Sequence, residues 1–258
     1  MPRFAANITL LFPELPFMAR FEAAAAAGFQ AVEYLFPSAY DPHEIRRELD
    51  RLGLIQALFN APPGDWDHGE RGLAAIPGRE AEFQASFETA LNFAEIIRPE
   101  RLHVMAGMAS GPAADAAYAA NLTHAAGRAA ERTPWLPLVI EPINGRDMPG
   151  YHLQTTAHAE QVLDYVGAPN LSLQLDLYHC QIMEGDLTKR IERLAPRIGH
   201  VQIASVPERN EPDSGELYFA HLFETLDRVG YSGWIGAEYR PRGRTTDGLG
   251  WFSPYARS

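Results

Sequence analysis

Short apolar runs recur along the chain and alternate with longer stretches whose apolar residues follow helical spacing. Runs rich in β-branched and aromatic side chains predict strands, and the longer spacers leave room for helical crossovers between parallel strands. The predicted strands are Phe4–Asn7, Ala31–Phe36, Ile55–Asn60, Arg101–Ala106, Pro137–Ile143, Leu171–Tyr178, Ile198–Ala204 and Trp234–Tyr239. Strict alternation of eight strands with helices predicts an α/β fold, a closed (β/α)8 TIM barrel that forms a single domain over residues 1–258.

Helix boundary signals support this alternation. Asp41, followed by proline, predicts a helix start, Glu44 completes the cap signal, and Gly53 predicts the end of the same helix. The rival fold is an open doubly wound sheet, which usually carries a glycine-rich turn after its first strand. No such turn follows Phe4–Asn7. The closed barrel is therefore favoured.

Two connections are longer than a simple turn, residues 61–79 and residues 205–216. Both follow strands, so they are expected at the face where barrel active sites form. Long loops in a compact domain are usually lids or binding loops, although a decorative insertion is the alternative.

Composition narrows the class of protein. Lys and Arg number 22 against 33 Asp and Glu, which gives a net charge of −11 and argues against nucleic acid or an anionic membrane as partner. Hydrophobic residues at 46% and charged residues at 21% are typical of a globular chain. A single cysteine excludes a disulfide framework. No apolar run is long enough to span a bilayer and no signal peptide is recognisable, so we expect a cytoplasmic protein.

Four polar side chains lie near the carboxyl ends of otherwise apolar predicted strands: Glu141, Asp176, Gln202 and Glu238. In a barrel these ends are neighbours on one rim, and unpaired carboxylates there would be costly to desolvate. Arg240 is the one cation in these strand ends. A bound divalent ion would offset the cost, and an all-oxygen ligand set suits Mg²⁺ or Mn²⁺ better than zinc. Ordinary salt-bridge or cap partners are the alternative.

The same rim suggests proton-transfer chemistry. Glu141 and Glu238 could act as an acid/base pair, one removing a proton next to a carbonyl and the other returning it to the neighbouring carbon. His179, three residues after Asp176, could reach a substrate oxygen or proton, or could be a supporting histidine. Cys180 is expected to be a buried thiol without chemistry. Such proton transfer needs no organic cofactor and no nucleophilic Ser or Cys, and the sequence contains no G-x-S-x-G elbow or P-loop.

Several segments are similar to one known family over essentially the whole chain. They are RFAANITLLF, GFQAVEYLFP, PPGDWDHGERGLAAIPGREAEF, IEPIN, MPGYHLQTT, QLDLYHCQIMEG, IGHVQIAS and GWIGAEYRP. The chain resembles the bacterial hydroxypyruvate isomerases, within the xylose-isomerase-like barrel superfamily. The GDW…GERG…PGRE loop is the most specific part of this resemblance.

The resemblance implies an activity and a site. The family interconverts hydroxypyruvate and 2-hydroxy-3-oxopropanoate (tartronate semialdehyde) through an enediolate, which implies a role in glyoxylate metabolism. Its metal ligands correspond to Glu141, Asp176, Gln202 and Glu238, and its acid/base pair to the two glutamates. His179 takes the place of a substrate-contacting residue.

The substrate of that family is an anion, and its charge must be offset locally in a protein of net charge −11. Arg71 and Arg240 are the candidate substrate-binding cations, and surface salt bridges are their alternative role. The family usually carries Lys where this chain has Arg240, whose planar fork suits a carboxylate. If Arg71 binds substrate, Arg71→Ala raises KM sharply.

Other functions stay open at this point. The nearest is a 2-oxo-tetronate isomerase, followed by a ketose epimerase, which would act on a neutral sugar and would not need Arg71 or Arg240. A metal-dependent endonuclease would need zinc-binding histidines and a basic groove. A catalytically silent barrel that binds a metal or a regulator is the last alternative, and loss of activity with a chelator and recovery with Mg²⁺ or Mn²⁺ would exclude it. The expected partner is a small anionic hydroxy-keto acid, with no nucleic acid or membrane partner, and the chain is a possible homo-oligomer.

Overall fold

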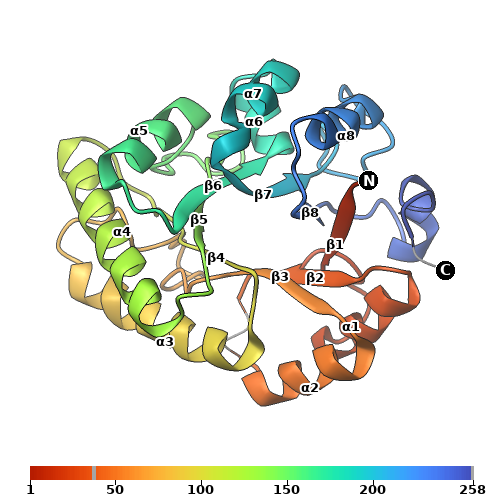
Figure 1. Ribbon diagram of the computed structural model, residues 1–258, viewed down its shortest axis with the longest axis horizontal. Helices are drawn as coiled ribbons and strands as arrows, with labels where there is room; N and C mark the ends of the chain where they lie inside the picture. The colour runs from red at the N-terminus through yellow and green to blue at the C-terminus, as the bar shows by residue number, and fades with distance from the viewer. Residues whose placement is uncertain (37–38, 257–258) are drawn as a thin grey trace.

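Eight parallel strands close on themselves in sequence order, and helices surround them (Figure 1). The computed structural model describes residues 1–36 and 39–256. The strands are β1 Arg3–Asn7, β2 Ala31–Tyr34, β3 Ile55–Asn60, β4 Arg101–His103, β5 Leu138–Ile140, β6 Leu171–Asp176, β7 Ile198–Ile203 and β8 Trp234–Ala237. The predicted (β/α)8 barrel is confirmed.

The helices follow the strands as the alternation predicted. They are α1 Phe17–Ala26, α2 Pro42–Leu52, α3 Glu80–Ile97, α4 Pro112–Arg132, α5 Thr156–Val166, α6 Leu177–Met183, α7 Leu187–Leu194 and α8 Phe219–Arg228, with 3-10 turns at Ala195–Arg197 and Thr245–Trp251. Helix α2 has the predicted ends, because the Asp41 side chain accepts from the His43 N–H at 2.9 Å and Gly53 closes the helix at φ 65°. Within residues 1–36 and 39–256, no helix is both long and apolar enough to cross a membrane.

Most predicted strands extend too far at their carboxyl ends. The predicted ends Phe36, Ala106, Ile143, Tyr178, Ala204 and Tyr239 lie one to three residues beyond the observed ends Tyr34, His103, Ile140, Asp176, Ile203 and Ala237. At the amino ends, β1 begins at Arg3 rather than Phe4, and β5 at Leu138 rather than Pro137. Most of the excess residues are buried, although Leu35 and Phe36 are half-buried, so they carry a strand-like hydrophobic pattern. They have nevertheless left the ladder, and they enter loops or, after β6, helix α6.

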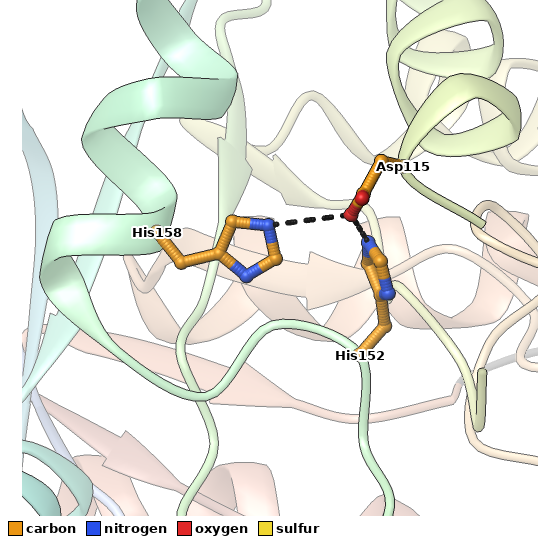
Figure 2. A group of neighbouring side chains, drawn as sticks. All are labelled: Asp115, His152 and His158. Carbon is orange, nitrogen blue, oxygen red and sulfur yellow. Dashed lines mark ion pairs between the residues drawn. The ribbon is translucent and has the colours of Figure 1, made fainter. Parts of the chain in front are cut away.

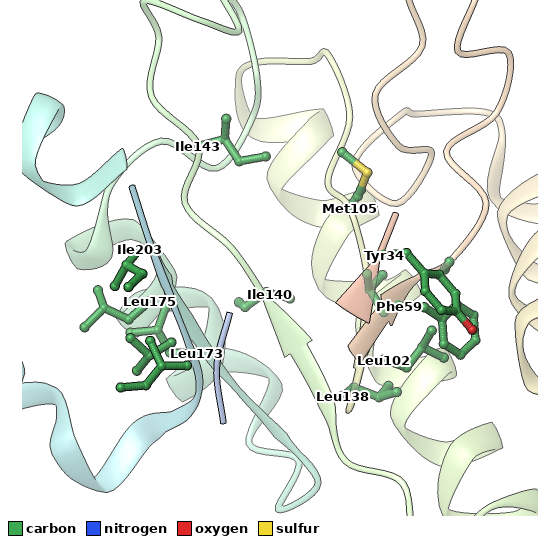
Figure 3. Packing of buried hydrophobic residues seen from close by; sticks show 14 of the residues in the cluster. Tyr34, Phe59, Leu102, Met105, Leu138, Ile140, Ile143, Leu173, Leu175 and Ile203 are labelled. Carbon is green, nitrogen blue, oxygen red and sulfur yellow. The ribbon is translucent and has the colours of Figure 1, made fainter. Parts of the chain in front are cut away.

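Side chains alternate between the two faces of the barrel wall. The outward residues pack under the helices, and Figure 3 shows Leu173, Leu175 and Ile203 grouped along β6 and β7. At the amino end, a separate inner cluster consists of Ala5, Ala31, Ala57 and Trp234. Further along the same inward rows the buried residues are polar: Asn7, Glu33, His103, Gln174, Asp176, His200 and Gln202. The interior is therefore apolar at one end and polar at the end where the site forms.

The loop of residues 61–79 is fastened to the end of β4. Gly72 forms an isolated antiparallel bridge with Ala106, and the Ala75 N–H donates to the Ala106 carbonyl at 2.7 Å. At Gly72 φ is 119°, and a Cβ there would lie 2.4 Å from the Met105 carbonyl oxygen, so only glycine fits. The loop is thus an ordered wall at the carboxyl rim.

Candidate active site

The carboxyl rim brings three carboxylates and a histidine together. Glu141 follows β5, Asp176 ends β6, Glu238 follows β8, and His179 lies in the first turn of α6. All four are buried, and one ligand atom from each lies within 4.8 Å of the others. We call these four residues the rim cluster. The predicted neighbourhood of Glu141, Asp176 and Glu238 is therefore observed.

Asp176 has two roles because β6 passes directly into α6. As N-cap of the helix, its Oδ1 accepts the N–H of Tyr178 at 2.7 Å and that of His179 at 3.4 Å. This cap fixes the carboxylate and leaves Oδ2 directed toward the cluster, 3.6 Å from His179 Nε2. The same short turn therefore positions both the carboxylate and the histidine.

His179 is oriented through its other nitrogen. The Asn144 side-chain amide donates to Nδ1 at 2.6 Å, so the ring proton is placed on Nε2. Nε2 lies 3.9 Å from Glu141 Oε1. Burial, and then the nearby Arg209, lower the pKa of His179 well below its usual value, so the ring is neutral. A neutral imidazole with its N–H toward the cluster can donate to a substrate oxygen.

Arg209, from the loop after β7, is the cation that pairs with the rim carboxylates. Its Nη2 donates to Glu238 Oε2 at 2.7 Å and lies 4.0 Å from Asp176 Oδ2, and its guanidinium stacks on the Tyr178 ring. The backbone at Arg209 has φ 57°, a left-handed conformation that is unfavourable for arginine. Burial opposes the charge, but Glu238 and Asp176 outweigh it and raise the pKa of Arg209. The guanidinium therefore stays charged inside the site.

Burial controls the acidity of the carboxylates. Desolvation, followed by repulsion from Glu238 and Asp176, raises the pKa of Glu141 well above its usual value. Desolvation raises the pKa of Glu238 to about 7 and that of Asp176 to about 6, although Arg209 opposes both shifts. Without a further cation these carboxyl groups therefore tend to keep their protons, because one guanidinium does not compensate three carboxylate charges.

The unsatisfied oxygens of the rim cluster fit a divalent metal ion. Glu141 Oε1 and Asp176 Oδ2 are buried and have no hydrogen-bond partner among the described residues. Buried carboxylate oxygens without partners are costly, and a bound cation removes that cost. Because the donors are mainly carboxylate oxygens, they suit a hard ion such as Mg²⁺ or Mn²⁺.

Gln202 lies beside this group but is engaged by a second layer of polar residues. It is the Cα partner of Asp176 across β6 and β7. Its Oε1 accepts from Gln174 Nε2 at 2.6 Å, and its Nε2 donates to Glu33 at 2.7 Å. Asn7 bridges Glu33 at 3.0 Å and Glu238 at 3.3 Å. The role of Gln202 as a ligand stays a prediction.

Both predicted arginines line the same cavity, a space of about 290 Å³ over the rim cluster. Arg71 Nη1 donates to the carbonyls of Trp66 at 2.9 Å and Glu70 at 2.7 Å, and its guanidinium stacks on the Trp66 ring. Arg240 is exposed, and its backbone N–H donates to the Arg209 carbonyl at 2.7 Å. Substrate contact by Arg71 or Arg240 stays a prediction, and both loops expected at this face contribute to the cavity wall.

Several site residues were not predicted from the sequence. Arg209 lies in a loop that was expected at the site, but a loop residue has no strand-end position to single it out. His103, whose Nδ1 lies 3.6 Å from Glu141, ends β4 and follows the same strand-end pattern as the predicted residues. Asn7 and Asn60 end β1 and β3 in the same way. Extending that pattern to the first four strands would have found all three.

The fold and this geometry agree with a family comparison. A model described as "xylose isomerase-like TIM barrel" matches residues 21–255, nearly the whole chain. The chain belongs to the xylose isomerase-like TIM barrel family. The family resemblance inferred from the sequence motifs is therefore confirmed.

Relatives within this barrel family narrow the class of enzyme. A 2-oxo-tetronate isomerase from Cupriavidus necator is 53% identical, with 99% of each chain covered. The hydroxypyruvate isomerase of Escherichia coli is 42% identical over 99% of this chain and 100% of that protein. A crystal structure titled AP endonuclease, family 2, from Brucella melitensis is 48% identical, covers both chains fully and has a TM-score of 0.97. The chain is an isomerase of this family.

Proposed function

We propose that the protein interconverts hydroxypyruvate and 2-hydroxy-3-oxopropanoate by 1,2 proton transfer through an enediolate, with Glu141 and Glu238 as acid and base. The observation that carries this proposal is that both glutamates face one cavity with ligand atoms within 4.8 Å of each other. Two carboxyl groups at that separation can reach adjacent carbons of one small substrate. The hydroxypyruvate isomerase of Escherichia coli, at 42% identity, supports the same substrate.

Glu141, Asp176, Gln202 and Glu238 would hold a divalent ion, Mg²⁺ or Mn²⁺. When bound, such an ion acts as a Lewis acid that polarises the substrate carbonyl and stabilises negative charge on the substrate oxygens. The unpartnered oxygens of Glu141 and Asp176 support this assignment. Gln202 would join the set by turning its amide oxygen from Gln174 toward the carboxylates.

The two glutamates differ in their partners, which suggests their roles. Glu238 is paired with Arg209, so its ionised form is stabilised and it is suited to remove the proton from the hydroxyl-bearing carbon of hydroxypyruvate. Glu141 faces His103 and His179 instead, and it would return a proton to the neighbouring carbon. The hydroxyl proton also passes from the oxygen of the first carbon to that of the former carbonyl, so the carbonyl moves by one carbon, and the roles exchange in the reverse direction.

The charges around the cavity suit an anionic substrate. Arg71, Arg209 and Arg240 all line it, and we assign Arg71 and Arg240 to the substrate carboxylate, while Arg209 is already paired with Glu238. His179 would donate from Nε2 to a substrate oxygen. Three guanidinium groups around one small cavity favour an acid over the neutral sugar that a ketose epimerase would bind.

Incubation with hydroxypyruvate in D₂O, with and without a chelator, tests this function. We expect metal-dependent formation of 2-hydroxy-3-oxopropanoate, and deuterium at the new C–H carbon if the glutamates exchange with solvent. Proton NMR of the product measures both results. Absence of product with any 2-keto-3-hydroxy acid, in protein replenished with Mg²⁺ or Mn²⁺, would rule out the isomerase proposal.

A four-carbon 2-oxo-tetronate is the second candidate substrate. The relative named 2-oxo-tetronate isomerase is 53% identical to this chain, which favours this substrate. The same glutamates would act on it, because it too has a hydroxyl-bearing carbon next to the carbonyl, although a hydroxymethyl group replaces one hydrogen on that carbon. Comparing kcat/KM for the three-carbon and four-carbon acids under identical metal conditions decides between the two substrates.

A further inference from the structure

A second group of metal-ligating side chains lies outside the barrel. Asp115 comes from the first turn of α4, His158 from the first turn of α5, and His152 from the segment that precedes α5. Figure 2 shows both imidazole rings directed at the Asp115 carboxylate. One ligand atom from each residue lies within 4.8 Å of the others. We call these three residues the outer cluster.

His152 is the fixed member of the outer cluster. Its side chain is only 3% exposed, and its ring packs edge-on against Tyr118 with centroids 5.3 Å apart. The His152 backbone N–H donates to the Gly107 carbonyl at 2.9 Å, which connects this segment to the loop that follows β4. The buried Nε2 nevertheless has no hydrogen-bond partner within residues 1–36 and 39–256. A buried ring nitrogen aimed at a carboxylate without bonding to it needs another partner.

The separations suit an ion better than direct hydrogen bonds. His152 Nε2 lies 3.4 Å from Asp115 Oδ1, and His158 Nε2 lies 3.8 Å from the same oxygen. Hydrogen bonds between such atoms are about 2.7–3.2 Å long. A tetrahedral ion with bonds of about 2.0–2.1 Å places its ligand atoms about 3.3 Å apart. Small side-chain rotations would bring all three donors to that spacing.

We propose that Asp115, His152 and His158 form a second metal site, which binds Zn²⁺ or a similar borderline divalent ion. Two imidazole nitrogens and one carboxylate oxygen are a common zinc ligand set, and the hard ions expected at the rim cluster prefer oxygen alone. The remaining coordination position is open to solvent, since the Asp115 side chain is 57% exposed and that of His158 is 29% exposed. A groove between α4 and α5, lined by both residues, supplies the entry path.

The ionisation of His152 is consistent with this site. Burial, and then the neighbouring His158, lower the pKa of His152, although Asp115 opposes the shift. The neutral ring is the form that ligates a metal. The Asp115 carboxylate supplies negative charge to the outer cluster, so the proposed metal site needs no further charged side chain.

A metal at the outer cluster would join three segments of the chain. Asp115 begins α4, His158 begins α5, and His152 lies in the connection between β5 and α5. That same connection carries Asp147 and Met148, which line the substrate cavity. The ion would therefore clamp one wall of the cavity to the outer helices, and zinc should stabilise the folded chain.

Zinc titration against a chromophoric chelator tests the proposal. The starting protein is the Glu141→Gln/Asp176→Asn double variant, which removes two carboxylates of the rim cluster and so makes the result independent of the proposed isomerase site. We expect this protein to bind one zinc ion per chain. Adding His158→Ala or Asp115→Asn should weaken binding by at least about tenfold, because a direct ligand is lost. Both residues are solvent-accessible, so these variants should fold.

His43→Ala is the matched control, because His43 is an exposed histidine in the first turn of α2. Its zinc affinity should equal that of the starting protein. Co²⁺ provides a second readout, since a visible band from nitrogen-containing coordination should appear and should disappear with His158→Ala. If zinc binds equally well to the His158→Ala, Asp115→Asn and His43→Ala proteins, or does not bind the starting protein, the outer cluster is not a metal site. If the double variant fails to fold, stoichiometry decides: wild type should bind one more zinc ion per chain than His158→Ala, and equal stoichiometry would overturn the proposal.

Discussion

The rim cluster and the outer cluster bring metal-ligating side chains together in opposite ways. The rim cluster contains three carboxylates and one histidine, all buried at the ends of barrel strands. The outer cluster contains two histidines and one carboxylate, on segments outside the barrel, and its Asp115 is exposed. The first collects carboxylates among buried residues, and the second collects imidazole nitrogens beside solvent.

This difference determines how strongly each cluster depends on a bound cation. Glu141, Asp176 and Glu238 are buried close to one another, Arg209 offsets part of their charge, and the proposed cation would offset more of it. The outer cluster depends less on an ion, because His158 and Asp115 can be hydrated and, of its ligand atoms, only His152 Nε2 is buried without a partner among the described residues. In the proposed function the rim cluster therefore depends on its ion more strongly than the outer cluster does, and the outer cluster suits reversible binding.

The largest expected effect comes from the rim glutamates. Glu238→Gln keeps the shape of the side chain but cannot accept a proton, so kcat should fall by about 10³-fold. Glu141→Gln should cause a loss of similar size. Initial rates with hydroxypyruvate measure both effects.

Glu88→Gln is the control for these variants. Glu88 accepts from Arg128 at 2.6 Å and from Arg132 at 2.6 Å between α3 and α4, and it does not line the cavity. Its loss should leave kcat unchanged, with only a small change in stability. A Glu238→Gln enzyme that keeps more than a tenth of the wild-type kcat would contradict the acid/base role.

Removal of metal should produce the next largest effect and should separate the two clusters. Chelation should lower kcat by about a hundredfold or more, because the Lewis acid is lost from the rim cluster. Added Mg²⁺ or Mn²⁺ should restore activity equally in wild type and in His158→Ala. If metal restored activity only when His158 is present, catalysis would depend on the outer cluster. The proposed separation of the two clusters would then be wrong.

The fold and much of the rim cluster follow from the sequence because strand ends have a fixed geometry. In a parallel barrel every carboxyl end reaches the same rim, so a polar residue that ends an apolar strand must lie near the others. That rule found Glu141, Asp176 and Glu238 without any coordinates. The strand ends themselves were less predictable, because buried loop residues such as Ile143 keep a strand-like pattern after the ladder stops.

Loop and surface partners could not be predicted in this way. Arg209 reaches Glu238 only because the loop after β7 folds back, and its φ of 57° is not expected from an arginine. Asp115 and His152 are 37 positions apart and share no periodic pattern. Their proximity depends on how α4 and the segment before α5 pack, which a single sequence does not reveal.

A smaller effect is expected from Arg71, which lies on the cavity wall and outside the rim cluster. Arg71→Ala should raise KM for hydroxypyruvate by about tenfold or more, because a charged hydrogen bond to the substrate is lost, while kcat changes little. Arg71→Lys keeps the charge and should give an intermediate KM, since it loses the planar fork and the stacking on Trp66. Steady-state kinetics separate KM from kcat. An unchanged KM in Arg71→Ala would remove this residue from the substrate site.

The smallest effect on catalysis is expected from His158→Ala, which should leave kcat/KM unchanged. Without zinc its Tm should shift by less than about 2 °C, because the side chain is partly exposed and Thr155 still caps α5 through the residue 158 backbone N–H. Zinc at about a hundredfold excess over Kd should raise the wild-type Tm by about 5–10 °C, through a linkage of about 2.7 kcal/mol. Calorimetry should show no such rise in His158→Ala. An equal rise in both proteins would mean that zinc stabilises the fold from the rim cluster, and the distinction between the two clusters would then be wrong.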